Sequence, residues 1–273
     1  MNILFCCDHS VEDGVLIATL SLLKHVKEPL HIYVLTMSVT SKKGHMMPVS
    51  NQMIDCIQHE LVKVDPKSTV VKIDCTALFN QAPPQANMAS RFTPYSMLRL
   101  YADLIPQLPD RILYLDADIV CRQSFSRFYH QDLTNTEFVG VLDHYGKWFF
   151  HHELKVYDYV NSGVLLLNLA YIRHTGLFKR ARYLCETRQK FMPDQAALNK
   201  LSHTKRIAPE RFNEQHRIQP DTVFQHFTTS FKFFPWVHTF TVKPWEVQRV
   251  RSELGLHDYD DVLGKYLKLK QQA

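Results

Sequence analysis

Short apolar runs alternate with stretches of helical periodicity over the first third of the chain. The runs at residues 2–7, 30–37 and 69–73 predict three buried strands. After residues 10–13, whose order resembles a capping box, apolar side chains recur at the 3.6-residue spacing of a helix, and residues 50–63 show a second helical pattern. This β-α-β-α-β order predicts an α/β fold with a largely parallel sheet and helices on both of its faces.

The pattern changes at residue 76. Residues 76–93 are polar, contain Pro83-Pro84 and show no periodicity, so they are predicted to form a loop. Regular elements are predicted again beyond this loop. The predicted strands are 111–115, 138–142 and 164–169, and the predicted helices are 95–105, 172–189, 195–201 and 259–272.

Aromatic residues crowd the chain after residue 220. They are Phe224, Phe227, Phe231, Phe233, Phe234, Trp236, Phe240 and Trp245. Such a cluster is typical of core and sheet-covering positions, and the functional alternative is a binding platform, since flat rings stack on aromatic faces. We predict one domain at 1–245 and a helical tail at 246–273. Because the tail ends with Lys265, Lys268 and Lys270, it is predicted either to pack on the domain as a solvated helix or to contact anionic lipid at the inner face of the cell membrane.

Composition narrows the class of protein. The formal net charge is only +5 and no basic block occurs before the C-terminus, so nucleic acid is not an expected partner. The chain contains neither the GxGxxG pattern of dinucleotide-binding folds nor the GxxxxGK[ST] phosphate loop. Six cysteines without CxxC spacing, no long apolar segment and no basic leader together predict a soluble protein of a reducing compartment, the cytoplasm.

Two carboxylates directly follow one of the predicted strands. Asp116 and Asp118 stand at the carboxyl end of the strand at 111–115, where open α/β sheets bind their ligands. Both can reach one hard cation such as Mn²⁺ or Mg²⁺, which is commonly shared with a diphosphate; a solvated aspartate turn is the alternative. The sequence Asp116-Ala117-Asp118-Ile119-Val120 also fits the nucleophile motif of haloacid-dehalogenase-like phosphotransferases. That motif normally follows the first strand, whereas here it lies mid-chain.

Further short motifs occur in a fixed order along the chain. They are Phe5-Cys6-Cys7-Asp8, Arg99, Asp116-Ala117-Asp118, Asp143, Asn161-Ser162-Gly163 with Asn168, Pro193-Asp194-Gln195 with Asn199, and His226 with Lys232. Each motif alone is weakly specific. The ordered set, over residues 2–245, resembles glycosyltransferase family 8, the group that includes bacterial lipooligosaccharide α-galactosyltransferases and glycogenin.

The resemblance implies a GT-A fold, a single Rossmann-like nucleotide-sugar-binding domain with a mixed, mostly parallel central sheet. It implies a retaining hexosyltransferase that moves galactose or glucose from a UDP-sugar to a glycan or lipid-linked saccharide acceptor in α configuration. It also implies a Mn²⁺ or Mg²⁺ cofactor ligated by Asp116, Asp118 and His226. The residues implied to contact the donor or its metal are Cys6, Asp8, Ser10, Arg99, Asp116, Ala117, Asp118, Asp143, Asn161, Ser162, His226, Thr229 and Lys232.

Catalysis is implied to involve Gln195, Asp194 and Lys232. Because no strong nucleophile stands at the matching place, front-side displacement is favoured, with the Gln195 amide oxygen supporting oxocarbenium character and Lys232 stabilising the leaving diphosphate. Double displacement through Asp194 is the alternative. Purely structural roles are also open: helix caps at Asp8, Asp194 and Gln195, an ion pair at Arg99 and a core position for His226.

The chain departs from the family's motifs in two places. Thr229 replaces the glycine of the HxxGxxK motif, and the family's Lys-Pro-Trp is matched at residues 232–236 with two extra residues. A glycine lets the backbone approach a phosphate closely. These departures therefore keep open the alternative of a non-catalytic module that binds a nucleotide-sugar or a glycan.

Overall fold

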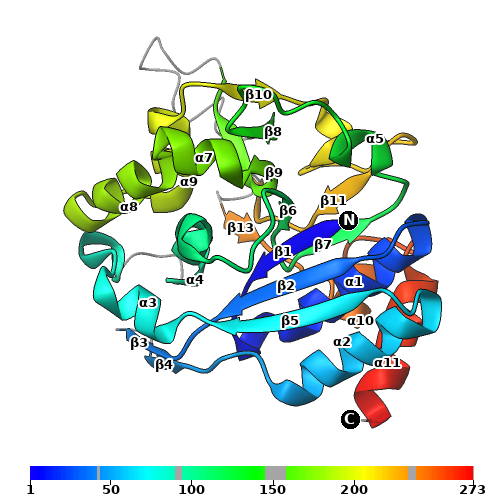
Figure 1. Ribbon diagram of the computed structural model, residues 1–273. Coiled ribbons are helices and arrows are strands. Elements are labelled where there is room, and N and C mark those ends of the chain that lie inside the picture. Colours follow the sequence, from blue (N-terminus) through cyan, green and yellow to red (C-terminus); the bar gives the residue numbers. More distant parts are fainter. Residues whose placement is uncertain (42–43, 90–93, 145–157, 233–237, 273) are drawn as a thin grey trace.

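A seven-stranded sheet forms the centre of the computed structural model, which describes the chain except residues 42–43, 90–93, 145–157, 233–237 and 273 (Figure 1). The strands lie in the order β10-β8-β9-β6-β1-β2-β5. Their bounds are β1 Asn2–Cys6, β2 His31–Thr36, β5 Thr69–Asp74, β6 Arg111–Leu115, β8 Phe138–Leu142, β9 Val160–Asn168 and β10 Lys205–Ile207. Every neighbouring pair is parallel except those of β9 with β6 and β8, which confirms the predicted α/β fold with a mixed, mostly parallel sheet.

The reversed direction of β9 determines what lies beside the end of β6. Apart from Asn168, the residues of β9 are buried, as expected for a central strand with an apolar run. Because β9 runs against β6, Val164 pairs with Leu115, and the Asp116 N–H donates to the Gly163 carbonyl at 2.8 Å. The segment 161–163 is thereby brought against the residues that follow β6.

Helices cover both faces of the sheet, each set over its own hydrophobic core (Figure 1). The first core packs against α1, α2 and α11, and the second against α4, η3, α7, α8 and α9. The bounds are α1 Glu12–His25, α2 Asn51–Val64, α4 Tyr95–Leu98, η3 Arg99–Leu104, α7 Leu169–Thr175, α8 Leu177–Thr187, α9 Pro193–Leu201 and α11 Asp260–Gln272. The other helices of the described residues are η1 His9–Val11, α3 Thr76–Gln81, η2 Gln85–Asn87, α5 Ser126–Tyr129, η4 Glu210–Phe212 and α10 Val247–Ser252.

Short antiparallel pairs lie beside the central sheet. β7 (Ile119–Cys121) pairs with β11 (Phe224–His226), β12 (Ser230–Lys232) with β13 (His238–Phe240), and β3 (Val39–Ser41) with β4 (Gly44–Met46). The β7–β11 pair places His226 opposite Ile119, immediately after the turn that carries Asp116 and Asp118. Two parts of the chain that are far apart in sequence therefore meet at the end of β6.

Two local predictions are wrong, and a third is right in extent but not in the type of helix. The predicted loop at 76–93 contains α3 and η2; α3 begins where Asp74 Oδ1 accepts from the Thr76 N–H at 2.8 Å, and it is too short to show a periodic pattern. The predicted helix at 95–105 continues beyond α4 as the 3₁₀-helix η3. The predicted helix at 172–189 is divided into α7 and α8 because Gly176, at φ +68°, ends α7.

The aromatic residues after 220 contribute to the core, as predicted, where the structure describes their side chains. Phe224 and Phe227 are buried, and the Phe224 ring lies 5.2 Å from that of Phe125, centroid to centroid. Phe240 and Trp245 pack against the same core while remaining partly exposed. The side chains of Phe231, Phe233, Phe234 and Trp236 lie outside the described residues.

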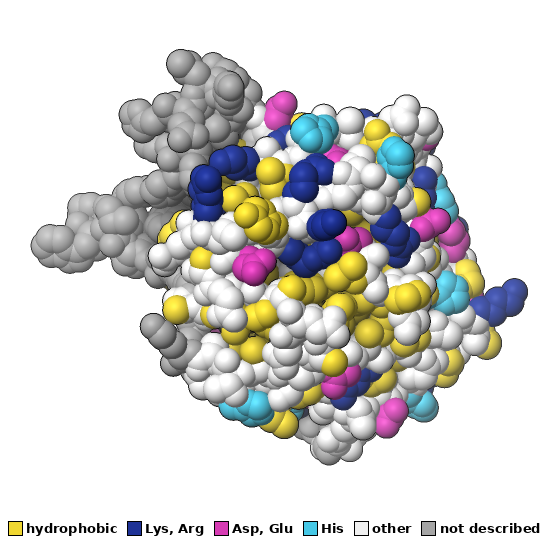
Figure 2. Space-filling view, turned by 60° about the vertical axis from the view of Figure 1, so that its left-hand side comes forward, with side chains coloured by type: hydrophobic (Ala, Val, Ile, Leu, Met, Phe, Trp, Pro, Cys, Tyr) yellow, Lys and Arg dark blue, Asp and Glu magenta, His cyan; other side chains and the backbone are white. Residues whose placement is uncertain are grey.

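The surface over the second core mixes apolar and basic side chains. Figure 2, which turns the left-hand side of Figure 1 forward, shows hydrophobic side chains gathered at the centre of this face with Lys and Arg side chains beside them. Leu104 and Tyr183, from η3 and α8, are 46% and 68% exposed. Exposed apolar side chains are ordinary on folded proteins, so we assign this face no function.

Helix α11 packs on the first core together with α1 and α2. Leu263 and Tyr266 are buried in that core, Lys265 pairs with the buried Glu60 at 2.5 Å, and Lys270 pairs with Asp13. Of the three lysines near the C-terminus, Lys265 and Lys270 are thus engaged in ion pairs. No helix in the described part of the chain is both long and apolar enough to cross a membrane.

We expect Leu263→Ala to lower the free energy of unfolding by about 2–5 kcal/mol, because it removes a buried side chain from the core that α11 shares with α1. Urea denaturation followed by circular dichroism measures this loss. The matched control is Lys268→Ala on the exposed face of the same helix, which should change the free energy by less than about 0.5 kcal/mol. Equal stability of the two variants would mean that α11 folds separately from the domain.

Candidate active site

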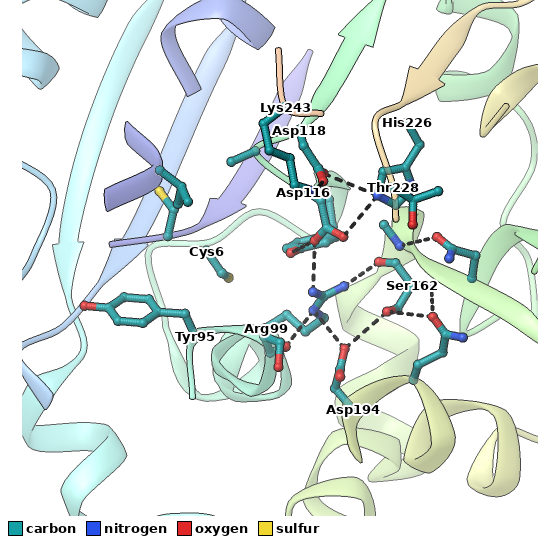
Figure 3. Close-up of a pocket in the computed structure, with 18 of the residues that line it drawn as sticks. Cys6, Tyr95, Arg99, Asp116, Asp118, Ser162, Asp194, His226, Thr228 and Lys243 are labelled. Carbon is teal, nitrogen blue, oxygen red and sulfur yellow. Dashed lines mark hydrogen bonds and ion pairs between the residues drawn. The ribbon is translucent and has the colours of Figure 1, made fainter. Parts of the chain in front are cut away.

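The carboxyl ends of β1 and β6 and the start of β9 border a cavity of about 360 Å³ (Figure 3). Open α/β sheets bind their ligands in such crevices. Of the predicted site residues, Asp143 does not line this cavity, and the side chain of Lys232 lies outside the described residues. All the other predicted site residues line the cavity. They are Cys6, Asp8, Ser10, Arg99, Asp116, Ala117, Asp118, Asn161, Ser162, Asp194, Gln195, His226 and Thr229.

Asp116, Asp118 and His226 converge in this cavity. After β6 ends, the Asp116 carbonyl accepts from the Ile119 N–H at 3.2 Å, and the chain turns into β7 beside β11. His226 Nε2 lies 3.3 Å from Asp118 Oδ1 and 3.8 Å from Asp116 Oδ2. One ligand atom from each of the three residues lies within 4.8 Å of the other two.

This group fits a divalent cation such as Mn²⁺ or Mg²⁺. Two carboxylate oxygens and one imidazole nitrogen form a donor set suited to such metals. Gly163 keeps the space beside them open, because a Cβ at this position would lie 2.3 Å from His226 Cε1 and 2.9 Å from Asp116 Oδ2. The glycine thus allows the imidazole and the carboxylate to lie directly against β9.

We expect Gly163→Ala to weaken Mn²⁺ binding by about 10- to 100-fold, since the added methyl group displaces the His226 ring or the Asp116 carboxylate. Titration of free Mn²⁺ by electron paramagnetic resonance measures the affinity. Gly264→Ala is the control, because a Cβ there meets nothing within 4 Å. Unchanged Mn²⁺ affinity in a folded Gly163→Ala protein would contradict the assignment of this group as a metal site.

Arg99 and Tyr114 hold Asp116 through one of its two oxygens. Tyr114 Oη donates to Asp116 Oδ1 at 2.5 Å, and Arg99 Nη2 lies 3.0 Å from the same oxygen. The guanidinium carbon lies 4.0 Å from the centroid of the Tyr114 ring, and Arg99 Nε lies 3.4 Å from Asp194 Oδ2. Because Oδ1 is occupied, Oδ2 is the oxygen that faces His226. Arg99 therefore forms the structural ion pair that the sequence left open and also lines the cavity.

The charges of this cluster shift one another's pKa values. Burial opposes ionisation of Asp118, but Lys243 and His226 more than offset it and hold the pKa of Asp118 well below its usual value. Burial also opposes protonation of His226, whereas Asp118 raises the pKa of the imidazole above its usual value. Burial raises the pKa of Asp194, with Arg99 acting in the opposite direction. Asp118 is thus ionised at neutral pH, the form that binds a cation.

Lys243 is the main site residue that the sequence analysis missed. Its Nζ lies 2.5 Å from Asp118 Oδ2 and donates to the Phe227 carbonyl at 2.9 Å (Figure 3). An unbroken Lys-Pro-Trp stands at 243–245 and could have indicated it. The paired strands β12 and β13 lie between His226 and Lys243 and widen the usual spacing. The side chain of Lys232, which the sequence selected instead, lies outside the described residues.

Asp8 lies at the cavity wall and also caps a helix. Its Oδ1 accepts from the Ser10 N–H at 2.9 Å and from Ser10 Oγ at 2.5 Å, at the start of η1. The helix-cap alternative for Asp8 is therefore observed. The capping box predicted at 10–13 is absent from these residues, since Glu12 accepts from the Ser50 N–H at 2.7 Å instead. Cys6 lines the same end of the cavity and is a free thiol, as are the other five cysteines.

A network of polar side chains lies beside the acid pair. Gln195 Oε1 accepts from the Ser162 N–H at 3.0 Å, and Ser162 Oγ lies 3.2 Å from Asp194 Oδ2. Gln195 Nε2 donates at 3.1 Å to Asp143 Oδ2, which also accepts from Asn161 Nδ2 at 2.9 Å. Asp143 is therefore buried behind Asn161 rather than exposed on the cavity wall.

Other residues complete the wall without having been assigned to the donor site from the sequence. They are Cys7, Val11, Tyr95, Ser96, Tyr114, Gly163, Met192, Thr228, Lys243 and Trp245. No motif singles out Tyr95, Ser96, Met192 or Thr228. Thr229, which replaces the family's glycine, lines the cavity and accepts from Thr241 Oγ1 at 2.9 Å.

Solved structures share this architecture. An active-site mutant of LgtC has a TM-score of 0.70 at 17% sequence identity, with 100% of this chain and 96% of that chain covered. The galactosyltransferase LgtC in complex with donor and acceptor sugar analogs has a TM-score of 0.66 at 19% identity, with 97% and 96% covered. At these identities the likeness shows the fold, which is the GT-A fold of glycosyltransferases.

The chain belongs to glycosyl transferase family 8, whose family model matches residues 2–248. A putative glycosyltransferase from Haemophilus influenzae is 24% identical over 188 residues, which cover 66% of this chain and 52% of that protein. The matched segment thus spans about half the length of this curated relative. The family match confirms the resemblance found in the sequence.

Proposed function

We propose that the protein is a metal-dependent, retaining hexosyltransferase. It transfers galactose or glucose from a UDP-sugar to a hydroxyl group of a glycan or lipid-linked saccharide and forms an α linkage. The observation that carries this proposal is the convergence of Asp116, Asp118 and His226 in one cavity, with Lys243 on the same carboxylate. The complex of LgtC with donor and acceptor sugar analogs, a protein of the same fold, supports this choice of substrates.

The positively charged groups of the cavity are placed to receive a diphosphate. Asp116, Asp118 and His226 would hold a divalent cation, which when bound would supply Lewis-acid stabilisation of the charge that develops on the departing UDP. Lys243 adds a point charge at the same place. Lys232, which the motif spacing selects, is a second candidate for this role. Arg99 and Tyr114 fix Asp116, so that the carboxylate is preorganised before the donor binds.

The surroundings of Asp194 favour front-side displacement over double displacement. Its Oδ2 accepts from Ser162 Oγ at 3.2 Å and lies 3.4 Å from Arg99 Nε. A carboxylate engaged in this way is a weaker nucleophile. In the proposed step, the bond between the anomeric carbon and the phosphate oxygen breaks while the acceptor oxygen bonds to the same face of that carbon. The acceptor's proton passes to the departing phosphate oxygen, and Gln195 orients the sugar.

A hydrolysis panel of UDP-galactose, UDP-glucose and related donors, with and without Mn²⁺, tests the proposal. We expect Mn²⁺-dependent release of UDP from a hexose donor, followed by transfer in a screen of glycan acceptors. Binding of UDP without hydrolysis or transfer would instead identify a nucleotide-sugar-binding module. Phosphatase activity without any nucleotide would identify the phosphotransferase alternative, which family membership and the mid-chain position of the acid pair already disfavour.

A further inference from the structure

Asn213 is a fully buried asparagine beside the metal-ligand candidates, and neither the sequence motifs nor the proposed reaction assigns it a role. It follows η4 and is 0% exposed. Its Oδ1 lies 3.1 Å from His226 Nδ1, and its Nδ2 donates to Asn161 Oδ1 at 2.9 Å. The asparagine therefore joins the imidazole to the polar network around Asn161.

The direction of these hydrogen bonds follows from one neighbouring group that can act only as a donor. The backbone N–H of Gly163 can only donate, and it lies 2.9 Å from the side chain of Asn161. The Asn161 atom at that place must therefore be the amide oxygen. The same oxygen faces Asn213, which must supply its NH₂ group there because two amide oxygens would repel each other.

The orientation of Asn213 then decides which nitrogen of His226 carries a proton. Because the Asn213 NH₂ group faces Asn161, its oxygen faces His226 Nδ1, and Nδ1 must donate to it. In the neutral ring that a bound cation requires, this leaves the lone pair on Nε2. Nε2 is the atom that lies 3.3 Å from Asp118 Oδ1 and 3.8 Å from Asp116 Oδ2.

We propose that Asn213 is a positioning residue that holds His226 in the Nδ1–H tautomer and thereby presents Nε2 to the metal. The inference rests on the proposed function only in taking Asp116, Asp118 and His226 as a metal site. Asn161 also links Asn213 to Gln195, which is proposed to orient the sugar. The NH₂ group of Asn161 donates to Asp143, which also accepts from Gln195. A change at Asn213 therefore reaches both the metal site and the residues that orient the sugar.

The primary test measures Mn²⁺ affinity without any nucleotide, by electron paramagnetic resonance of free Mn²⁺. Asn213→Leu removes the acceptor for Nδ1–H, and we expect a 10- to 100-fold weaker affinity, as is typical when a partner of a metal-binding histidine is lost. Asn213→Asp retains an oxygen opposite Nδ1, so it should bind Mn²⁺ at least as tightly as the parent. Asn87→Leu is the matched control, since Asn87 is also 0% exposed but donates to the carbonyls of Cys185, in α8, and of Arg188, directly after it.

The tautomer itself provides a readout that requires no metal. With ¹⁵N-labelled histidine rings, and His226→Gln to assign the resonance, long-range ¹H–¹⁵N spectra should show a proton on Nδ1 in the parent and in Asn213→Asp. Asn213→Leu should shift His226 toward Nε2–H. A parent ring protonated at Nε2 but not at Nδ1 would overturn the proposal, as would unchanged Mn²⁺ affinity in Asn213→Leu or equal weakening in both Asn213 variants. None of these measurements uses a sugar donor, so they separate failure of this inference from failure of the proposed transfer activity.

Discussion

Replacing Asp118 by Asn lowers the rate of UDP-sugar turnover by about 10³-fold, if the proposed chemistry is correct. The substitution keeps the size of the side chain but removes the charge that faces both His226 and Lys243. A metal's stabilisation of transition-state charge contributes several kcal/mol, and each 1.4 kcal/mol corresponds to about a tenfold change in rate. Mn²⁺-dependent release of UDP under saturating donor measures the loss.

The control for Asp118→Asn is Asp55→Asn, which makes the same chemical change at an exposed position of α2. It should leave turnover unchanged. Circular dichroism on both variants separates loss of function from loss of fold. Asp118→Asn that binds UDP and turns over as the parent does would show that the acid pair does not hold the metal.

Replacing Lys243 by Met lowers turnover by about 10²-fold and weakens UDP binding. Loss of a hydrogen bond to a charged group costs about 1.5–3 kcal/mol, and the ammonium group is close to where the diphosphate is proposed to lie. The same variant should bind Mn²⁺ more tightly in the absence of nucleotide, because the ammonium group no longer competes for Asp118 Oδ2. Calorimetric titration with UDP and with Mn²⁺ measures both changes.

Two lysine variants sharpen this second prediction. Lys232→Met tests the residue selected by motif spacing, and Lys67→Met makes the same change at an exposed turn. We expect Lys67→Met to leave turnover and UDP binding unchanged. Of Lys243→Met and Lys232→Met, we expect Lys243→Met to cause the larger loss. A large loss of turnover in Lys232→Met alone would show that Lys232, and not Lys243, contacts the diphosphate.

The predicted fold agrees with the structure wherever an apolar run was long enough to be informative. The strands at the first residues, at 111–115 and at 138–142 were predicted within a residue or two because the burial of a parallel sheet leaves a nearly continuous apolar run. The three-residue strands β7 and β11 could not be predicted, because so short a segment carries no period. Their pairing depends on tertiary contacts that no local pattern records.

The site was predictable where a residue belongs to a compact motif. Asp116, Asp118 and the 161–163 segment fall into this class, and the structure places all of them at the cavity. Lys243 was missed because Lys232 occurs first at the motif spacing, before the β12–β13 pair. Asn213 has no motif at all, and only the directions of its hydrogen bonds reveal its importance.

The pairing of β7 with β11 also bears on how the protein is made. During synthesis Asp116 and Asp118 leave the ribosome well before His226 and Lys243, and nearly all of the large sheet can assemble in that interval. A nascent chain can therefore contain most of the central sheet before the proposed metal site is complete. The proposed metal site is therefore complete only after β11, a late segment of the chain, pairs with β7, an early one.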